Sequence, residues 1–314
     1  MKELRIGTAV SSKPGTAKGF LRVGDLPDGS PVDIPVLIAR GAADGPTLWI
    51  NGCVHGDEYC GAFIIHELFR SLDSGSLRGT IIALPVLNLT GFLKNQRMSP
   101  FEMMSHGDLN RCFPGKPDGS LTEQMACTIY TPLREHADYF VDFHTALTED
   151  VRWALFANMP GEVGRKGEGM ARAFGYKSTL PAPPEILGGS SMMTAAKDGI
   201  PALIVAAGGR GPAFSEETGK DGAERLRNLC RHLEMLPGKV TDYGKLTFFT
   251  NFAWVNSTRG GLFQPAVKCH DRLQQGSVVG RYYDLYGEQI EEVHSPAAGI
   301  VLAINPGPLM ANGE

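Results

Sequence analysis

The sequence lacks paired cysteines, a long apolar run and an apolar leader. Its six cysteines, at positions 53, 60, 112, 127, 230 and 269, include no Cys-x-x-Cys pair. Scattered thiols of this kind argue against a cysteine-rich structural zinc module and predict reduced cysteines. No stretch approaches the roughly 18 uninterrupted apolar residues of a membrane-spanning helix. The first residues, Met-Lys-Glu-Leu-Arg, lead into no apolar segment, so we expect no signal peptide and a cytoplasmic location.

The chain also lacks an excess of charge of either sign. It has 30 Lys and Arg residues against 34 Asp and Glu residues, which gives a formal net charge of −4. We therefore expect no broad basic surface for nucleic acid or for an anionic membrane. With 314 residues, 42% of them apolar, the chain can bury a substantial core. This length predicts one large domain with a small one, or two domains.

Apolar runs alternate with helical stretches from residue 47 to about residue 236. The expected strands are 47–51, 80–88, 139–144, 153–157 and 202–207, and the expected helices are 61–72, 121–135, 164–174, 191–197 and 222–233. Strands that are apolar throughout and separated by helices indicate a sheet covered on both faces. The first 45 residues indicate short strands and turns, with an extended run at 31–39. Short apolar runs and turns over 247–314 predict a small all-β region.

The most informative segment is 51–62, Asn-Gly-Cys-Val-His-Gly-Asp-Glu-Tyr-Cys-Gly-Ala, which directly follows an apolar run. It presents His55 and Glu58 at the point where a helix is expected to begin. Side chains three residues apart share one face of a helix, so this imidazole and this carboxylate can reach the same Zn²⁺ ion. Two ligands do not complete a site, and a third must come from elsewhere in the chain.

The third ligand is expected from segment 139–146, Tyr-Phe-Val-Asp-Phe-His-Thr-Ala. His144 ends this apolar run, and the small residues Thr145 and Ala146 leave room beside a metal. Two histidines and one carboxylate from separate strand ends are typical of a catalytic zinc site with an open position for water. Asp142 projects to the same side of an extended strand as His144. It is either a hydrogen-bonding partner of this ligand or a buried structural acid.

A simpler interpretation is that these residues have only structural roles. His55 and Glu58 would then cap a helix, and His144 would be a hydrogen-bonded residue of the core. Each residue taken alone favours this interpretation. The two segments taken together favour a metal site, because both place metal-ligating side chains at the ends of expected strands.

Two arginines lie in loops between these segments. Arg97 ends the sequence Asn-Gln-Arg, and Arg111 lies in Gly-Asp-Leu-Asn-Arg-Cys-Phe-Pro-Gly, residues 107–115. A guanidinium group binds a carboxylate through two hydrogen bonds, so both arginines are candidates for recognising an anion or a carbonyl group. The alternative is that both are solvated surface charges. Asp108 is expected to hold its loop or cap a turn rather than to act as a base.

Three motifs in this order carry a resemblance to a known family. His-Gly-Asp-Glu at 55–58, Asp-Leu-Asn-Arg-Cys-Phe-Pro-Gly at 108–115 and Asp-Phe-His at 142–144 resemble the succinylglutamate desuccinylase/aspartoacylase family. That family is similar in fold to the zinc carboxypeptidases, and the resemblance extends over residues 47–210. It implies an α/β fold in which helices flank a mixed sheet.

The resemblance also implies two domains. The zinc-hydrolase α/β domain would comprise residues 1–240, including the N-terminal strands, and a smaller β-rich domain would comprise residues 241–314. Within it, the segment from Gly276 to Gly299 resembles a biotinyl/lipoyl-type fold. The chain has no Met-Lys-Met biotinylation tripeptide there, so only the architecture is expected and not the modification.

The resemblance further implies the site residues and the reaction. The implied zinc ligands are His55, Glu58 and His144, with Arg97 polarising the scissile carbonyl and with Asn110 and Arg111 holding the carboxylate of the substrate. The implied reaction is hydrolysis of the amide bond of an N-acylated amino acid. Zinc lowers the pKa of its bound water to about 7, and zinc and Arg97 would share the oxyanion charge. The expected partner is this small molecule, without nucleic acid or membrane, and homo-oligomerisation is left open.

The chain departs from the family at the general base. Family members typically carry Glu-x-Gly-Gly after a strand that begins Ile-Pro-Ala. Here residues 200–209 read Ile-Pro-Ala-Leu-Ile-Val-Ala-Ala-Gly-Gly, so Ala206 stands where a glutamate would move the proton. Loss of such a group commonly lowers the rate by about 10²–10⁴-fold.

Ala206 leaves several interpretations open. Another group can take over the proton, and Glu216 and Glu217 in the loop expected to follow are the nearest candidates. The sequence can also be a variant inactivated by design, or the protein can be a catalytically impaired or non-enzymatic member that binds a ligand. A metallocarboxypeptidase would share the metal ligands and is a further alternative.

Overall fold

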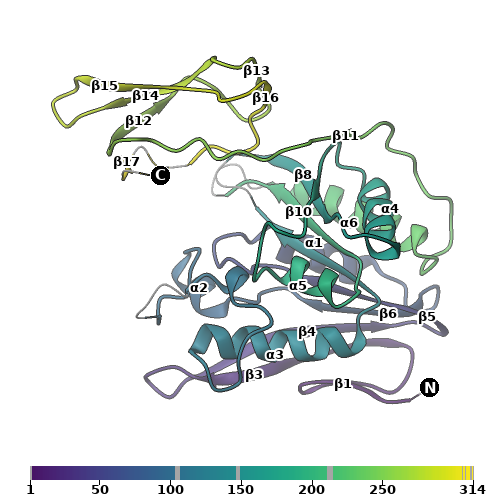
Figure 1. Ribbon diagram of the computed structural model, residues 1–314. Helices are drawn as coiled ribbons and strands as arrows, with labels where there is room; N and C mark the ends of the chain where they lie inside the picture. Colours follow the sequence, from purple (N-terminus) through teal and green to yellow (C-terminus); the bar gives the residue numbers. More distant parts are fainter. Residues whose placement is uncertain are drawn as a thin grey trace.

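A large mixed sheet forms the centre of the molecule (Figure 1). The computed structural model describes residues 2–102, 107–145, 149–210, 215–305, 307, 309–311 and 313. The strands of the large sheet are β3 (Gly15–Asp25), β4 (Pro31–Arg40), β5 (Ala43–Asn51), β6 (Arg78–Leu84), β7 (Tyr139–His144), β8 (Val151–Ala157), β9 (Ser178–Ala182), β10 (Ala202–Gly208) and β11 (Thr247–Phe248). Their order in space is β11-β9-β8-β10-β7-β5-β6-β4-β3.

Four neighbouring strands in the middle of this sheet are parallel. β6 pairs with β5, β5 with β7, and β7 with β10, each in the parallel direction. Their carboxyl ends therefore meet at one edge of the sheet, which is where ligands usually bind in open α/β sheets. Antiparallel strands flank this group, β8 beside β10 and β4 beside β6.

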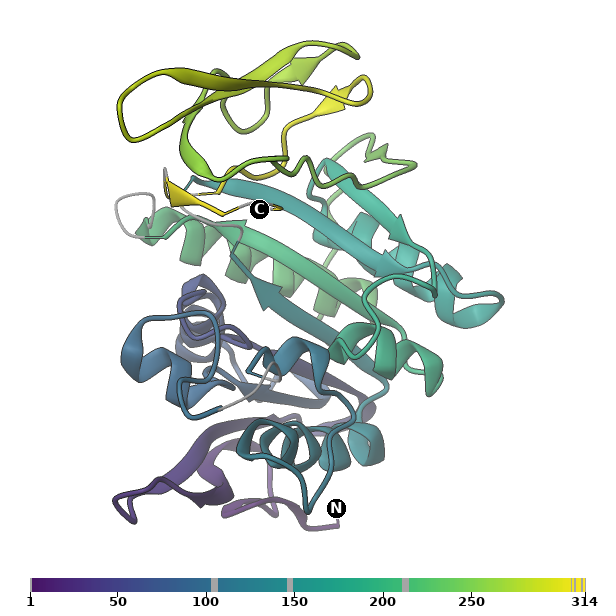
Figure 2. The ribbon, with the colours of Figure 1, turned by 60° about the vertical axis from the view of Figure 1, so that its left-hand side comes forward.

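Helices cover both faces of the sheet (Figures 1 and 2). One face carries α3 (Leu121–His136) and α5 (Ser191–Lys197), and the other carries α1 (Cys60–Ser71), α4 (Glu162–Phe174) and α6 (Glu216–His232). The short helices α2 (Leu89–Lys94) and η1 (Leu109–Arg111) lie in the connection between β6 and α3. Among the described residues, no helix has the length and apolar character needed to cross a membrane.

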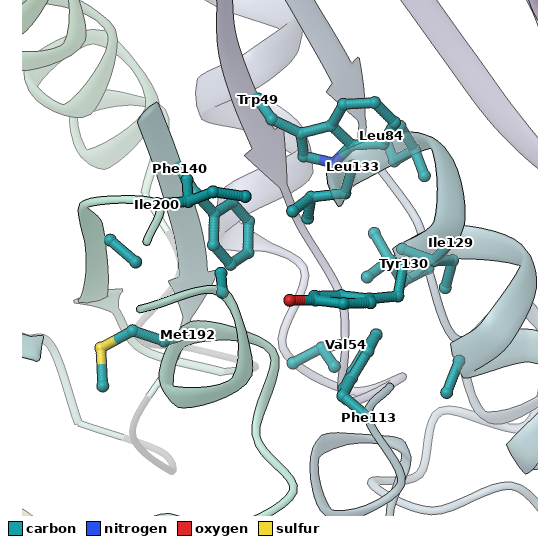
Figure 3. Packing of buried hydrophobic residues seen from close by; sticks show 14 of the residues in the cluster. Trp49, Val54, Leu84, Phe113, Ile129, Tyr130, Leu133, Phe140, Met192 and Ile200 are labelled. Atoms are coloured by element: carbon teal, nitrogen blue, oxygen red, sulfur yellow. The ribbon is translucent and has the colours of Figure 1, made fainter. Parts of the chain in front are cut away.

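The two faces bury two separate hydrophobic clusters. In the first, Trp49 and Phe140 of neighbouring strands face α3, whose Ile129 and Leu133 point into the same space (Figure 3). The second lies between the sheet and α1, α4 and α6, and its fully buried members include Leu68. Burying one such side chain contributes about 1.5–3 kcal/mol. Alternate residues of each strand therefore enter different clusters, which explains why the central strands are apolar throughout.

The C-terminal part of the chain is built from short antiparallel strands. One sheet has the order β15-β14-β12-β17, and a separate pair is formed by β13 and β16. The bounds are β12 (Gly261–Pro265), β13 (Arg272–Leu273), β14 (Val278–Tyr283), β15 (Gln289–His294), β16 (Gly299–Ile300) and β17 (Leu309–Met310). This part lies beside the end of the large sheet that contains β8 and β11 (Figure 1).

The predicted fold class is confirmed. The strand at 139–144 and the helix at 191–197 have the observed bounds, and the C-terminal part is β-rich. The division at residue 240 and the biotinyl/lipoyl-type fold stay predictions. β11, which lies beyond residue 240, pairs with β9 in the large sheet.

Three expectations about local structure were wrong. In the N-terminal region the short pair β1 (Leu4–Ile6) and β2 (Ala9–Ser11) fits the expectation, and β4 matches the extended run expected at 31–39. However, β3 is a single strand of 11 residues where short strands were expected, and it forms a long hairpin with β4. Strand β9 was not predicted from its five-residue sequence, which contains a proline. The loop expected around Glu216 and Glu217 is the first turn of α6, capped by Ser215. Polar residues and glycines in that turn hide the helical pattern from the sequence.

Leu68→Ala is expected to lower the free energy of unfolding by about 2–5 kcal/mol, because it leaves a cavity beneath α1. Leu68 is fully buried in the second cluster. Urea denaturation measures the change. Arg70→Ala on the same helix is the control, since the Arg70 side chain is 73% exposed; its expected effect is within about 0.5 kcal/mol. Equal effects of the two substitutions would contradict the described packing of α1.

Candidate metal centre

A tight turn between β5 and α1 carries the first two candidate ligands. The helix begins at Cys60, so His55 and Glu58 lie in the turn before it and not on one helical face as expected. The backbone N–H of Glu58 donates to the carbonyl of His55, which brings the two side chains together. Gly56 is required here, because a Cβ atom would lie 2.1 Å from the carbonyl carbon of Gly91.

The turn and the end of β7 bring three candidate ligands together. His55 Nδ1 lies 2.8 Å from Glu58 Oε1, and His144 Nδ1 lies 3.0 Å from Glu58 Oε2. One ligating atom from each of the three residues lies within 4.8 Å of the others. The three residues are buried, with His144 the most exposed at 12% of its side chain. Two imidazoles and one carboxylate in this arrangement could hold a metal ion.

The second ring nitrogen of each histidine also has a partner. His55 Nε2 lies 3.2 Å from Asp108 Oδ1, and His144 Nε2 lies 3.4 Å from Asp142 Oδ2. A carboxylate on the far nitrogen of a metal-binding histidine fixes the tautomer and the orientation of the ring. This chemistry of the donor set fits a metal ion, and Asp142 lies where a hydrogen-bonding partner of His144 is expected.

Further hydrogen bonds hold this second layer in place. The hydroxyl of Ser191 donates to Asp142 Oδ2, and the backbone N–H of Ser191 donates to Asn110 Oδ1 over 3.0 Å. Asn110 Nδ2 lies 3.3 Å from His144 Nε2. The backbone N–H of Thr145 donates to Glu58 Oε2 over 2.9 Å. Asn110 is therefore joined to the cluster, whereas Ala146, expected to leave room beside the metal, lies outside the described residues.

The charges around the cluster are strongly coupled. Burial raises the pKa of Glu58, but His55 and His144 outweigh it and hold the pKa well below its usual range. Burial likewise opposes ionisation of Asp108, yet its contact with His55, together with the charges of His55 and Arg97, holds its pKa far below normal. Burial alone would lower the pKa of His144, whereas Asp142 and Glu58 raise it to about 10. The buried carboxylates of the cluster are thus kept ionised by the imidazoles and the guanidinium group beside them.

Arg97 contacts the cluster and is also partly exposed to solvent. Its NH1 lies 3.2 Å from His55 Nδ1 and donates to Glu58 Oε1 over 3.3 Å, while NH2 donates to Asp108 Oδ2 over 3.0 Å. The side chain is 42% exposed, so a ligand can reach it. Arg111 is exposed on η1, and its NH1 donates to the carbonyl of Asn110 over 2.7 Å.

Ala206 lies beside His144. The two residues pair in register across the parallel strands β10 and β7. Ala202 and Ile204 of β10 enter the cluster on the α3 and α5 face, and the alternation of a strand places Ala206 on that face too. Its methyl group is buried, with 1% exposure. Glu216 and Glu217 begin α6 on the opposite face, and Glu216 pairs with Lys220 over 2.7 Å. This placement does not favour either glutamate as the missing base.

Several contributing residues were not found from the sequence. Ser191 and the backbone of Thr145 hold the second layer, and an ion pair joins Asp57 in the turn to Arg210 after β10. Asp57 lies inside the recognised motif, and Arg210 follows the Gly-Gly pair directly. Their places beside these motifs were the only signs in the sequence that the two residues could contribute to the site. The pairing itself requires the order of the strands.

Asp142→Asn is expected to weaken zinc binding by about 10-fold or more, because the neutral side chain no longer supports the His144 imidazole electrostatically. Zinc affinity is measured by competition with a chromophoric chelator. The control is Asp198→Asn, which lies away from the cluster. Asp198 accepts a hydrogen bond of 2.8 Å from the hydroxyl of Tyr130. Unchanged affinity in Asp142→Asn would contradict the assigned role.

The sequence matches a known catalytic domain and a known deacetylase. Residues 44–233 match the model of the succinylglutamate desuccinylase/aspartoacylase catalytic domain. Among curated proteins, the N-alpha-acetyl-L-2,4-diaminobutyric acid deacetylase of Halomonas elongata is 29% identical over 288 residues. That alignment covers 86% of this chain and 81% of the relative.

Solved structures share the fold of this chain. The product-bound ectoine utilization protein EutE (DoeB) from Ruegeria pomeroyi has a TM-score of 0.87 at 25% identity, covering 100% of this chain and 96% of that chain. A metallo-carboxypeptidase from Burkholderia cenocepacia has a TM-score of 0.54 at 15% identity, over 69% of this chain and 65% of that chain, which is a likeness of fold. Because the catalytic-domain match spans more than half of the chain, the chain belongs to the succinylglutamate desuccinylase/aspartoacylase family.

Proposed function

We propose that this chain is a zinc-dependent hydrolase of the amide bond of an N-acylated amino acid. The observation that carries the proposal is the buried cluster of His55, Glu58 and His144, whose ligating atoms lie within 4.8 Å of one another. Supporting carboxylates on the far nitrogens of both histidines are typical of metal centres. Similarity to the N-alpha-acetyl-L-2,4-diaminobutyric acid deacetylase of Halomonas elongata supports hydrolysis of an N-acylated amino acid as the reaction class.

Different residues of the chain would hold the zinc ion and orient its ligands in the proposed site. His55, Glu58 and His144 would hold the zinc ion, and Asp108 and Asp142 would keep the two imidazoles oriented. A bound zinc ion supplies a nucleophilic hydroxide near neutral pH and polarises the carbonyl group.

Arg97 would stabilise the charge that develops on the scissile carbonyl oxygen. Its guanidinium is at the cluster and half exposed, so it can donate to an oxygen that enters from solvent. A donor of this kind contributes about 10²–10³-fold to the rate. Asn110 and Arg111 would bind the carboxylate of the substrate. Arg111 is the more accessible of the two, because the Asn110 amide already contacts Ser191 and His144.

Ala206 supports a second candidate function. A methyl group cannot take a proton from water or return it to the leaving amine, so the buried alanine beside His144 favours an impaired enzyme or a non-enzymatic ligand-binding protein. Glu216 and Glu217 begin a helix on the other face of the sheet, which leaves the proton carrier unassigned.

The proposed function is tested by a screen of N-acyl amino acids with the zinc-loaded protein. The panel contains N-acetyl and N-succinyl amino acids, N-alpha-acetyl-L-2,4-diaminobutyric acid and short peptides. We expect release of the free amino acid from at least one acyl amino acid, lost in Glu58→Gln. Cleavage of peptides alone would identify a carboxypeptidase. Tight binding of an acyl amino acid without turnover would identify the non-enzymatic alternative.

Ala206→Glu is expected to raise the turnover of an accepted acyl amino acid by at least about 10-fold, because it restores a proton carrier beside His144. The matched control is Ala206→Gln, which has nearly the same shape but cannot carry the proton. Initial rates with the same substrate are compared for the three proteins. If Ala206→Glu is no faster than the unsubstituted chain, another residue already carries the proton.

A further inference from the structure

A partly buried ion pair joins the turn that carries His55 and Glu58 to the segment after β10. Arg210 NH1 donates to Asp57 Oδ2, and the two side chains are 22% and 9% exposed. Asp57 lies between His55 and Glu58 in the chain, so whatever fixes its carboxylate also restrains the turn on both sides. Arg210 follows β10, a strand that contributes none of the three candidate ligands.

The backbone at the end of β10 passes close to the start of α1, which places Arg210 beside this turn. Gly208 has a φ of +71°, and a Cβ atom there would lie 2.8 Å from Cys60 Sγ and 2.8 Å from a methyl group of Thr218. The thiol of Cys60, the first residue of α1, donates to the carbonyl of Gly209 over 3.4 Å. The chain therefore crosses the start of α1 at close range, and only glycine fits at position 208.

A second connection joins the same two segments through Thr145. Its hydroxyl donates to the carbonyl of Ala207 over 3.2 Å, and its backbone N–H donates to Glu58 Oε2 over 2.9 Å. The end of β10 thus contacts the metal-binding turn on one side through Arg210 and Asp57, and on the other through Thr145 and Glu58. Both connections act on the turn that carries two of the three candidate ligands.

Each charged group of the ion pair is partly removed from water and is stabilised by the opposite charge of its partner. Burial lowers the pKa of Arg210, because its guanidinium is partly removed from water. Within the described part of the chain, Arg210 Nε is buried and has no hydrogen-bond partner. Removing Arg210 would leave the buried carboxylate of Asp57 without a compensating charge. Asp57 is therefore expected to move toward water when Arg210 is lost, and the turn would move with it.

We propose that Arg210 is a positioning residue of the metal centre, which acts through Asp57 to hold His55 and Glu58 in their binding arrangement. The inference rests on the proposed zinc site. Outer partners of metal ligands typically change metal affinity by about 10–100-fold when they are removed. Lysine at position 210 would keep the charge but not the planar geometry of the guanidinium, so it would restore only part of the effect.

The test measures zinc affinity and stability separately. Zinc dissociation constants are determined by competition with a chromophoric chelator for the unsubstituted protein, Arg210→Gln, Arg210→Lys, Asp57→Asn and the double variant Asp57→Asn/Arg210→Gln. Urea unfolding of the zinc-free proteins reports stability. The control is Arg225→Gln, since Arg225 also forms a partly buried pair, with Asp221 over 2.9 Å, but lies on α6 away from the turn.

We expect Arg210→Gln to weaken zinc binding by at least about 10-fold, with Arg210→Lys intermediate. The double variant is expected to be no weaker than Arg210→Gln, because the pair acts as one unit. Arg225→Gln is expected to lower the free energy of unfolding but to leave the zinc dissociation constant within about two-fold of that of the unsubstituted protein. If Arg210→Gln does not fold, Arg210→Lys and Asp57→Asn carry the same comparison.

The outcomes separate the two proposals. If the unsubstituted protein binds no zinc, the proposed function fails, and this inference fails with it. If it binds zinc and the Arg210 and Asp57 variants bind within two-fold of it, the zinc site stands and the positioning role is overturned. Equal loss of zinc affinity in Arg225→Gln would also overturn the role, because the effect would then follow general stability.

Discussion

The candidate site depends on the hydrogen bonds that the carboxylate of Glu58 makes with two histidines and one backbone N–H. One of its oxygens lies 2.8 Å from His55, and the other lies 3.0 Å from His144 and accepts the backbone N–H of Thr145. This one buried group therefore joins the turn after β5 to the end of β7. Its burial would be unfavourable without these partners, so the same contacts that order the two segments also keep the carboxylate ionised. An ionised carboxylate between two imidazoles is a suitable place for a divalent cation.

The parallel strands explain why such a cluster forms at this edge of the sheet. β5, β7 and β10 end side by side, so side chains far apart in the sequence become neighbours. The same geometry places Ala206 next to His144, where a longer side chain would reach the cluster. The fold thus brings together three residues that could hold a metal ion, while an alanine stands where the family resemblance implies a proton carrier. Metal binding and proton transfer are separate requirements of catalysis, so a site of this kind can have the first without the second.

Much of this arrangement could be predicted from local sequence. His55, Glu58 and His144 each follow an apolar run, and an apolar strand with a polar residue at its end is readable without knowledge of the fold. The pair of Asp57 and Arg210 could not be predicted in this way, because the two residues are 153 positions apart and meet only through the strand order. The long N-terminal hairpin and the first turn of α6 were also missed. Their glycines and polar residues weaken the pattern, and tertiary contacts decide the structure there.

The central claim is that His55, Glu58 and His144 together hold one metal ion. Its most direct test is the zinc content, after exhaustive dialysis, of the unsubstituted protein and of His144→Ala, measured by plasma emission spectrometry on samples whose circular dichroism spectra agree. The account predicts about one zinc ion per chain in the unsubstituted protein and a small fraction of that in the variant. Equal zinc content in the two proteins, or no zinc in either after loading, would contradict it.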